Sequence, residues 1–400
     1  MKKVTYILFY VSLILYEIFA MNQVVAWQLD TESSSNRLVL LVFFMAGLLF
    51  VALSKKNVSQ SSFGKSFIFF YGYLLLISAL HGVLNGFENR SALLDYTLPF
   101  ICFFVEYYAQ YDFGLKKLRR ILVLACFIIL SANYLINYQV VSIATGDAIV
   151  GTNASYFILY FLPILCFVTN QKLHKYNFII VAFMVLLSTK RGETLGLALG
   201  IIMYIYIRIR QSQTLGRYGI FRIFSILTSI VVVLAILYFI NNLYGGFLFE
   251  RLIGSIDDEG SGRLTIFEDS IDLIKKSDAI GRVFGHGYNA VKYKLVLSAH
   301  NDFLEIIYDF GYICVLLFMV FVVKGFVCSF KHHDLEIRPI LGLSFSIMLV
   351  CSLISVIVVR TYYLNLLALC WGAASGIPKY YSSITKKKTS HQKILPIHHQ

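Results

Sequence analysis

Charged residues are scarce in this sequence, and their scarcity excludes an ordinary soluble fold. Asp, Glu, Lys and Arg make up 14% of the 400 residues, whereas a soluble domain usually carries about a quarter. Apolar runs recur along most of the length, and each is long enough to cross a bilayer core of roughly 30 Å. The composition therefore predicts an all-α, polytopic membrane protein.

Paired cysteines and a cleavage site are also lacking. None of the seven cysteines lies in the long polar loop and no two have C-x-x-C spacing, which excludes a disulfide framework and a zinc site. We expect no metal and no cofactor. The first apolar run follows Lys2 and Lys3 as in a signal peptide, but it continues to Trp27 without a small-residue cleavage site. It is therefore predicted to be a retained transmembrane helix.

Hydropathy and the distribution of basic residues together predict the topology. We expect about twelve spans, at residues 5–25, 38–53, 66–84, 92–109, 118–138, 153–169, 176–189, 192–208, 221–243, 303–323, 339–358 and 361–377. Lys and Arg collect in alternate short connections, which predicts that both termini are cytoplasmic. The net charge of +13 thus reflects membrane topology, and we expect no nucleic-acid partner.

The predicted organisation has four parts. They are nine transmembrane helices (1–243), a long extracytoplasmic loop (244–300), three further transmembrane helices (301–377) and a basic cytoplasmic tail (378–400). The tail could also associate with lipid.

Five basic residues stand in the outer short connections, Arg37, Arg90, Lys190, Arg191 and Arg360, and the last three call for a role besides topology. Lys190 and Arg191 precede Gly192 between two apolar runs, and Arg360 lies at a tight connection. A cation near the membrane needs a reason, because burying it is costly. Snorkelling to the interface explains Arg360 as well as a binding role does, whereas the adjacent pair favours an anion site.

The long loop contains a predicted amphipathic helix. After the turn-forming stretch DDEGSG, apolar residues recur at 264, 267, 271 and 274, with Ser261 as a plausible N-cap. The stripe could lie on the membrane or on the helix ends beneath it. Arg263 falls in the first turn, where a cation is electrostatically unfavourable unless it binds an anion together with the free N–H groups.

The end of the loop carries glycines and a histidine. Gly281, Gly285 and Gly287 permit a turn, and a phosphate-cradling loop is the weaker alternative. His300 precedes an apolar run, with Asn301 or Asp302 as the cap. A neutral imidazole there could accept a proton from a hydroxyl, or His300 could be an interfacial residue satisfied by the cap.

Two carboxylates follow one helical turn apart. Glu305 and Asp309 enter the membrane zone, so they should face protein or water. They could orient the site, bind a cation or pair with buried donors.

Four segments, taken in order, resemble the signature of the O-antigen ligase and O-antigen polymerase superfamily. They are STKRGETLGLALG, SGRLTIFEDSIDLI, GHGYNA and AHNDFLEIIYDFGYICVLLF. The resemblance covers residues 180–325, and the twelve-helix layout extends it to the whole chain. In the superfamily that the chain resembles, His-Asn is followed after nine residues by Gly-x-x-Gly/Thr/Tyr. His300, Asn301 and Gly311 match this pattern, but Cys314 occupies its last position.

The resemblance implies a metal-independent, inverting, GT-C-like membrane glycosyltransferase. Its donor would be a glycan on polyprenyl diphosphate, with Arg191 and Arg263 on the diphosphate and His300 as the general base. Secondary diphosphate candidates are Lys190, Arg282 and Arg360. Candidates for substrate binding are Asn301, Tyr288, Gly285 and Gly287.

We interpret the chain as a polymerase that joins lipid-linked repeat units of O-antigen, capsule or exopolysaccharide at the outer face of the bacterial cytoplasmic membrane. A ligase that transfers the same donor to lipopolysaccharide core is the alternative, because both need one donor site and a base. A flippase for the lipid-linked unit would predict an internal repeat, and none is visible. Membrane lipids, a flippase and a chain-length regulator are the expected partners.

Overall fold

The computed structural model describes residues 1–31, 37–54, 62–85, 90–146, 151–213, 238, 242, 263–356 and 361–377. All regular secondary structure in these ranges is helical. Seven of the described helices are long and apolar enough to cross a membrane. The prediction of an all-helical membrane protein is confirmed, while the number of twelve spans and the orientation stay predictions.

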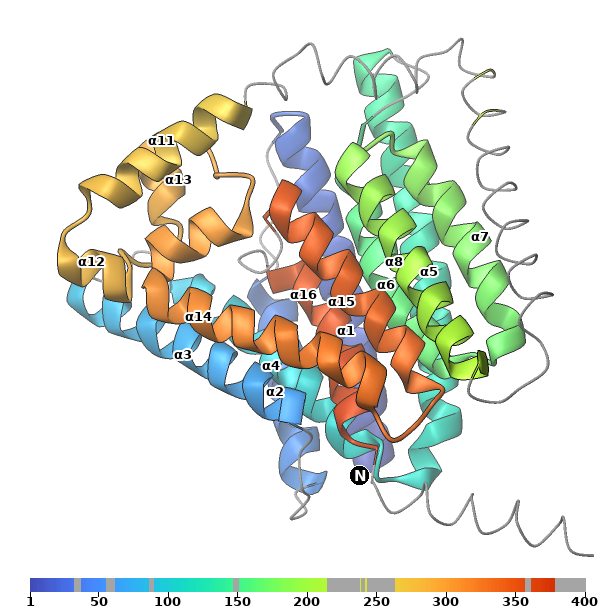
Figure 1. Ribbon diagram of the computed structural model, residues 1–400. Coiled ribbons are helices and arrows are strands. Elements are labelled where there is room, and N and C mark those ends of the chain that lie inside the picture. Colours follow the sequence, from blue (N-terminus) through green and yellow to red (C-terminus); the bar gives the residue numbers. More distant parts are fainter. Residues whose placement is uncertain are drawn as a thin grey trace, which may run out of the picture.

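The helices carry the labels of Figure 1. Before the long loop they are α1 (Lys2–Gln28), α2 (Arg37–Ser54), α3 (Ser62–Asn85), α4 (Arg90–Ala109), α5 (Phe113–Thr145), α6 (Ser155–Val168), α7 (Gln171–Leu187) and α8 (Arg191–Gln213). In and after the loop they are α11 (Arg263–Lys276), α12 (Ala279–Phe284), α13 (Ala290–Leu295), α14 (Asp302–Lys331), α15 (Ile337–Ile354) and α16 (Thr361–Ser375).

A helix occurs at every expected span that falls within the described ranges. The expected span 221–243 lies outside them, apart from the single positions 238 and 242, and so do Ser261 and the tail 378–400. Helix α5 runs beyond its expected end at residue 138, to Gly146 in the left-handed conformation (φ 73°). Hydropathy underestimated it because the added turns contain the polar residues Gln139, Ser142 and Thr145, of which Thr145 donates from Oγ1 to the backbone oxygen of Val141 at 3.0 Å.

Small residues let the central helices approach closely. A β-carbon built on Gly372 of α16 would lie 2.1 Å from the backbone oxygen of Phe103 in α4. One built on Gly196 of α8 would lie 2.6 Å from Cys351 Sγ in α15. Such close approaches at glycines stabilise helix pairs in membranes, where water drives no association between spans. They hold α16 on α4 and α15 on α8.

The loop folds into three helices, where the sequence predicted one. Helices α12 and α13 have six residues each, too few for a periodic pattern to be recognised. Figure 1 shows α11, α12 and α13 grouped beside the first half of α14, away from α5 to α8. Leu273 and Ile274 of α11 pack with Val291, Ala299 and Tyr308. The apolar side of α11 therefore covers the protein beneath it.

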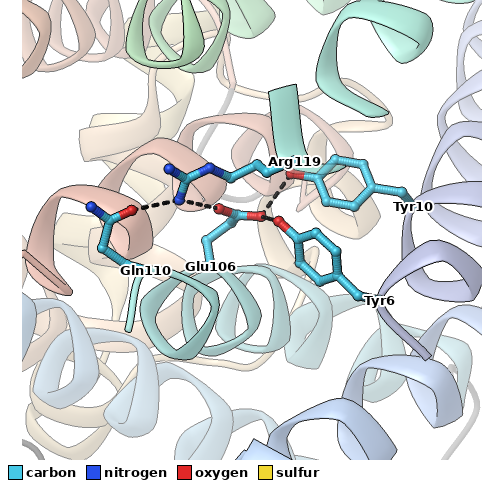
Figure 2. Close-up of polar contacts among 5 residues, drawn as sticks. All are labelled: Tyr6, Tyr10, Glu106, Gln110 and Arg119. Carbon is cyan, nitrogen blue, oxygen red and sulfur yellow. Dashed lines mark hydrogen bonds and ion pairs between the residues drawn. The ribbon is translucent and has the colours of Figure 1, made fainter. Parts of the chain in front are cut away.

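One buried polar network ties three membrane helices together (Figure 2). The Tyr6 and Tyr10 hydroxyls of α1 donate to Glu106 Oε1 of α4 at 2.5 and 2.7 Å. Arg119 of α5 pairs with Glu106 Oε2 at 3.5 Å and donates to Gln110 Oε1 at 2.6 Å. Glu106 is fully buried, and its three partners Tyr6, Tyr10 and Arg119 make that burial tolerable because a lone buried charge is very costly.

Candidate active site

The start of α14 is held by Asn301. Its Oδ1 accepts hydrogen bonds from the backbone N–H groups of Phe303 and Leu304 at 2.9 and 3.2 Å. Asn301, and not Asp302, is thus the N-cap. Its Nδ2 donates to the backbone oxygen of Leu353 near the end of α15, at 3.1 Å. One side chain therefore starts α14 and joins it to α15.

His300 has a left-handed backbone. Its φ of 52° lies where residues with a side chain are uncommon. On the preceding residue, the N–H of Ala299 donates to Glu305 Oε1 at 2.8 Å, and both Ala299 and Glu305 are buried. A sparsely populated conformation persists when its surroundings determine it. The Glu305 carboxylate and the Asn301 cap hold His300 from both sides.

The junction before α8 is built in a similar way. Thr189 is left-handed, with φ 50°, and Lys190 and Arg191 follow it. The Ser188 hydroxyl donates to Glu193 Oε2 at 3.2 Å and accepts from the Lys190 N–H at 3.4 Å. Glu193, fully buried, thus supports the turn that carries the two cations.

The sequence interpretation missed Glu193. A carboxylate in the first turn of an apolar helix is a recognisable signal, because burying it needs donors close by.

The two junctions meet at the end of α15. A β-carbon built on Gly192 would lie 3.1 Å from Ile354 Cγ2, and the next residue back, Leu353, accepts from Asn301. Segments more than 100 residues apart along the chain therefore flank two consecutive residues of α15. The turn of Lys190 and Arg191 and the turn of His300 lie at one end of this helix.

The glycine turn packs against a kink in α14. A β-carbon on Gly285 would lie 2.2 Å from the Asp309 backbone oxygen, and one on Gly311 would lie 2.1 Å from the Val283 backbone oxygen. Gly311 interrupts α14 with φ 81° and ψ 172°. Each glycine makes room for the backbone on the other side, so neither segment can carry a side chain there.

The N–H groups of the turn are engaged within the fold. Gly285 donates to Gly281 O at 2.7 Å, His286 to Tyr308 O at 3.0 Å, and Gly287 to Asp309 O at 2.8 Å. Their geometry is that of a packed turn. The assignment of Gly285 and Gly287 to substrate binding stays a prediction.

The two carboxylates of α14 pair with buried donors. Asp309 Oδ1 accepts from the N–H of Val291 in α13 at 3.0 Å, as Glu305 accepts from Ala299. Of the three roles considered for these carboxylates, both contacts match pairing with buried donors. The bond from Ala299 to Glu305 also orients the His300 segment. Among the described residues, no group of three or more His, Cys, Asp or Glu side chains could hold a metal ion.

His286 connects the loop helices outside the membrane spans. Its Nε2 lies 2.8 Å from Ser277 Oγ, and its ring lies 4.5 Å from that of Tyr308. Burial lowers the pKa of His286 below its usual 6.5, and the charges of His81 and Lys294 lower it further, against the opposing effect of Asp278. The neutral imidazole therefore fits this position.

The remaining predicted site residues occupy varied positions. Arg191 and Arg263 begin α8 and α11, but their side chains lie outside the described part of the structure, as does all of Arg360. The exposed Arg282 donates to the backbone oxygen of Lys275. The Tyr288 ring meets the Tyr96 ring edge-on at 5.0 Å.

Residues 176–319 match the family model described as O-antigen ligase. This segment contains both junctions and all three loop helices. The resemblance to the O-antigen ligase and polymerase superfamily is confirmed. No curated protein matches the chain. The matched model and the apolar helices together support a membrane protein with glycosyltransferase activity of the O-antigen ligase or polymerase type.

Proposed function

We propose that this protein is a polysaccharide polymerase that transfers a growing glycan from polyprenyl diphosphate to a hydroxyl of the next lipid-linked repeat unit. The observation that carries the proposal is the meeting of the His300 and Lys190–Arg191 turns at Leu353 and Ile354 of α15. A transfer reaction of this kind needs a base and an anion site within reach of one substrate, and this arrangement supports both.

His300 is the proposed general base. In the reaction, the acceptor hydroxyl oxygen attacks the anomeric carbon of the donor, the bond to the diphosphate oxygen breaks, and His300 takes the hydroxyl proton. A positioned base typically contributes about 10²–10⁴ in rate. The anchoring of Ala299 by Glu305 and the cap made by Asn301 support this role, because a general base must be held in place.

Arg191 and Arg263 are the proposed diphosphate ligands. Each begins a helix of 14 or more residues, where N–H groups free of helix partners also favour an anion. A guanidinium offers a planar pair of donors to phosphate oxygens, and its positive charge stabilises the leaving diphosphate. Lys190, Arg282 and Arg360 are secondary ligands in this proposal, and Asn301 and Tyr288 complete the site around the acceptor.

A ligase is the second candidate, because the matched family model is itself described as O-antigen ligase. It would use the same donor site and transfer the glycan to the lipopolysaccharide core. The two reactions differ in the acceptor, and the accumulating product distinguishes them.

The test is a gel of surface polysaccharide from a deletion strain that carries wild type, His300→Ala or His333→Ala at equal membrane levels. His333 follows the opposite end of α14, which makes it a matched control. We expect a ladder from wild type and the control, and a single repeat unit from His300→Ala. Lipid-linked polymer with no surface glycan would identify a ligase. An unchanged ladder from His300→Ala would refute His300 as the base and favour a transporter.

A further inference from the structure

Helix α12 has an exposed apolar side. Ile280, Val283 and Phe284 are 71%, 38% and 45% exposed, and their spacing of three and four places them on one face of the helix. Gly281 is buried on the other side, where a β-carbon would lie 2.4 Å from the His286 ring. The helix thus packs through its glycine and turns its large aliphatic and aromatic side chains outward.

Exposed apolar side chains also occur in and just after α13. Tyr293, Val296 and Leu297 are 66%, 80% and 53% exposed. Val296 has φ 65°, a conformation that is unusual for a β-branched residue. Large apolar side chains gathered on the surface normally mark an interaction site. We call these six residues together the loop apolar face.

Within residues 279–297 the charges have one sign, and the exposed Asp278 precedes them as the N-cap of α12. Residues 279–297 contain Arg282, Lys292 and Lys294 and no Asp or Glu, and all three cations are exposed. An apolar surface edged by cations is the pattern of a segment that lies on an anionic lipid surface. A protein partner would need to supply matching acidic groups around an aliphatic centre.

Two contacts place this face at the depth where helices leave the membrane. Lys292 Nζ lies 5.8 Å from the ring centroid of Trp27, in the last turn of α1. A β-carbon on Gly287 would lie 3.2 Å from the His81 ring, near the end of α3. Tryptophan at the end of a span is typical of the membrane interface.

The lipid-facing surface of α3 extends toward the same level. Near the end of α3, Leu80 and Val83 are 48% and 69% exposed. They belong to a helix that is long and apolar enough to span the membrane. Exposed apolar side chains therefore occur both at the end of this span and on the loop helices.

We infer that the loop apolar face lies in the headgroup and acyl boundary of one leaflet, with Lys292 and Lys294 on anionic headgroups. The loop helices are then partly immersed in the membrane interface. The inference depends on exposure, charge and depth alone, so it stands or falls separately from the proposed transfer reaction.

The experiment uses the full chain in nanodiscs that contain anionic lipid brominated near the headgroup end of its acyl chains. Trp27→Phe removes the exposed native tryptophan and leaves Trp371, which is fully buried. In this background Phe284→Trp reports on the loop apolar face. Glu268→Trp is the matched control, because Glu268 is an exposed residue of α11 and lies outside that face.

We expect bromine to quench the new tryptophan of Phe284→Trp at least twofold more than that of Glu268→Trp. Replacing anionic lipid by neutral lipid should reduce the difference, as should Lys292→Gln with Lys294→Gln. Equal quenching by bromine, with both tryptophans open to aqueous acrylamide, would overturn the inference. Protection of Phe284→Trp only in discs that hold two copies would also overturn it and assign the face to self-association.

Discussion

The Asn301 side chain donates from Nδ2 to the backbone oxygen of Leu353 at 3.1 Å while its Oδ1 caps α14. The same amide thus serves the start of one helix and the end of another. Because Gly192 packs on the adjacent Ile354, this contact determines how the His300 turn sits relative to the Lys190–Arg191 turn.

Replacing Asn301 separates these two tasks. Asn301→Ala should lose about 1–2 kcal/mol of stability with the cap and most of the activity. Asn301→Asp keeps an acceptor for the cap but has no donor for Leu353 O. We expect it to melt near the wild-type temperature and still transfer glycan at least tenfold more slowly. Full activity of Asn301→Asp would show that the contact with α15 does not position the site.

Arg191→Lys tests the diphosphate assignment. An ammonium retains the charge but lacks the planar fork, so transfer from a purified lipid-linked donor should fall at least tenfold, about 1.4 kcal/mol in barrier height. Arg210→Lys is the control, because Arg210 is exposed in the last turn of the same helix. Equal rates in both variants, with unchanged donor affinity, would contradict the assignment.

Gly311→Ala should destabilise the packing of the loop helix α12 against α14. A backbone at φ 81° and ψ 172° is essentially restricted to glycine and costs a residue with a side chain roughly 1–3 kcal/mol, and the new β-carbon would also meet Val283 O. Gly72→Ala is the matched control, because nothing lies within 4 Å of a β-carbon there. Thermal unfolding in detergent should show a clearly lower melting temperature for Gly311→Ala only. Similar melting temperatures for both variants would contradict the close packing of Gly311 against Val283.

The loop should become less stable in acid through His286. Its folded pKa lies below 6.5 because of burial, so its contribution is complete above pH 6.5 and is lost as the pH falls toward the folded value. Asp278, His81, Lys294 and Tyr308 face the ring and are common to all variants. Hydrogen-exchange protection across 279–296, taken relative to the intrinsic exchange rate at each pH, should fall from pH 7.5 to 5.5 more in wild type than in His286→Gln. An identical fall in both would assign the effect to another group.

The Glu106 network should depend on pairing. Arg119→Leu leaves a buried carboxylate without its cation and should destabilise the protein by about 3–5 kcal/mol. Glu106→Gln added to Arg119→Leu removes that charge and keeps an acceptor for Tyr6 and Tyr10, so it should recover much of the loss. Melting temperatures of the single and double variants check this. Equal values would mean that the unpaired charge of Glu106 is not the cause of the destabilisation.

The sequence predicted those features that depend on local pattern. Apolar length identified the helices, since a bilayer demands it, and an amphipathic helix with Arg263 in its first turn is present as expected. The contacts that assemble the site were not predictable, because Asn301 and Leu353, or Gly285 and Gly311, are distant in sequence and meet only through packing. Glu305 was recognised as a group that needed a partner, but only the fold identified that partner as Ala299.

The reciprocal fit of Gly285 and Gly311 has a consequence for exchanging parts between related proteins. Because each glycine leaves space only for the backbone opposite it, the loop and the first half of α14 form one exchangeable module. A chimera with a junction between 296 and 302 would combine the Gly285 turn of one protein with the Gly311 kink of another and lose the fit. A junction beyond Gly311 would transfer both halves intact, so a change in acceptor preference could be sought there.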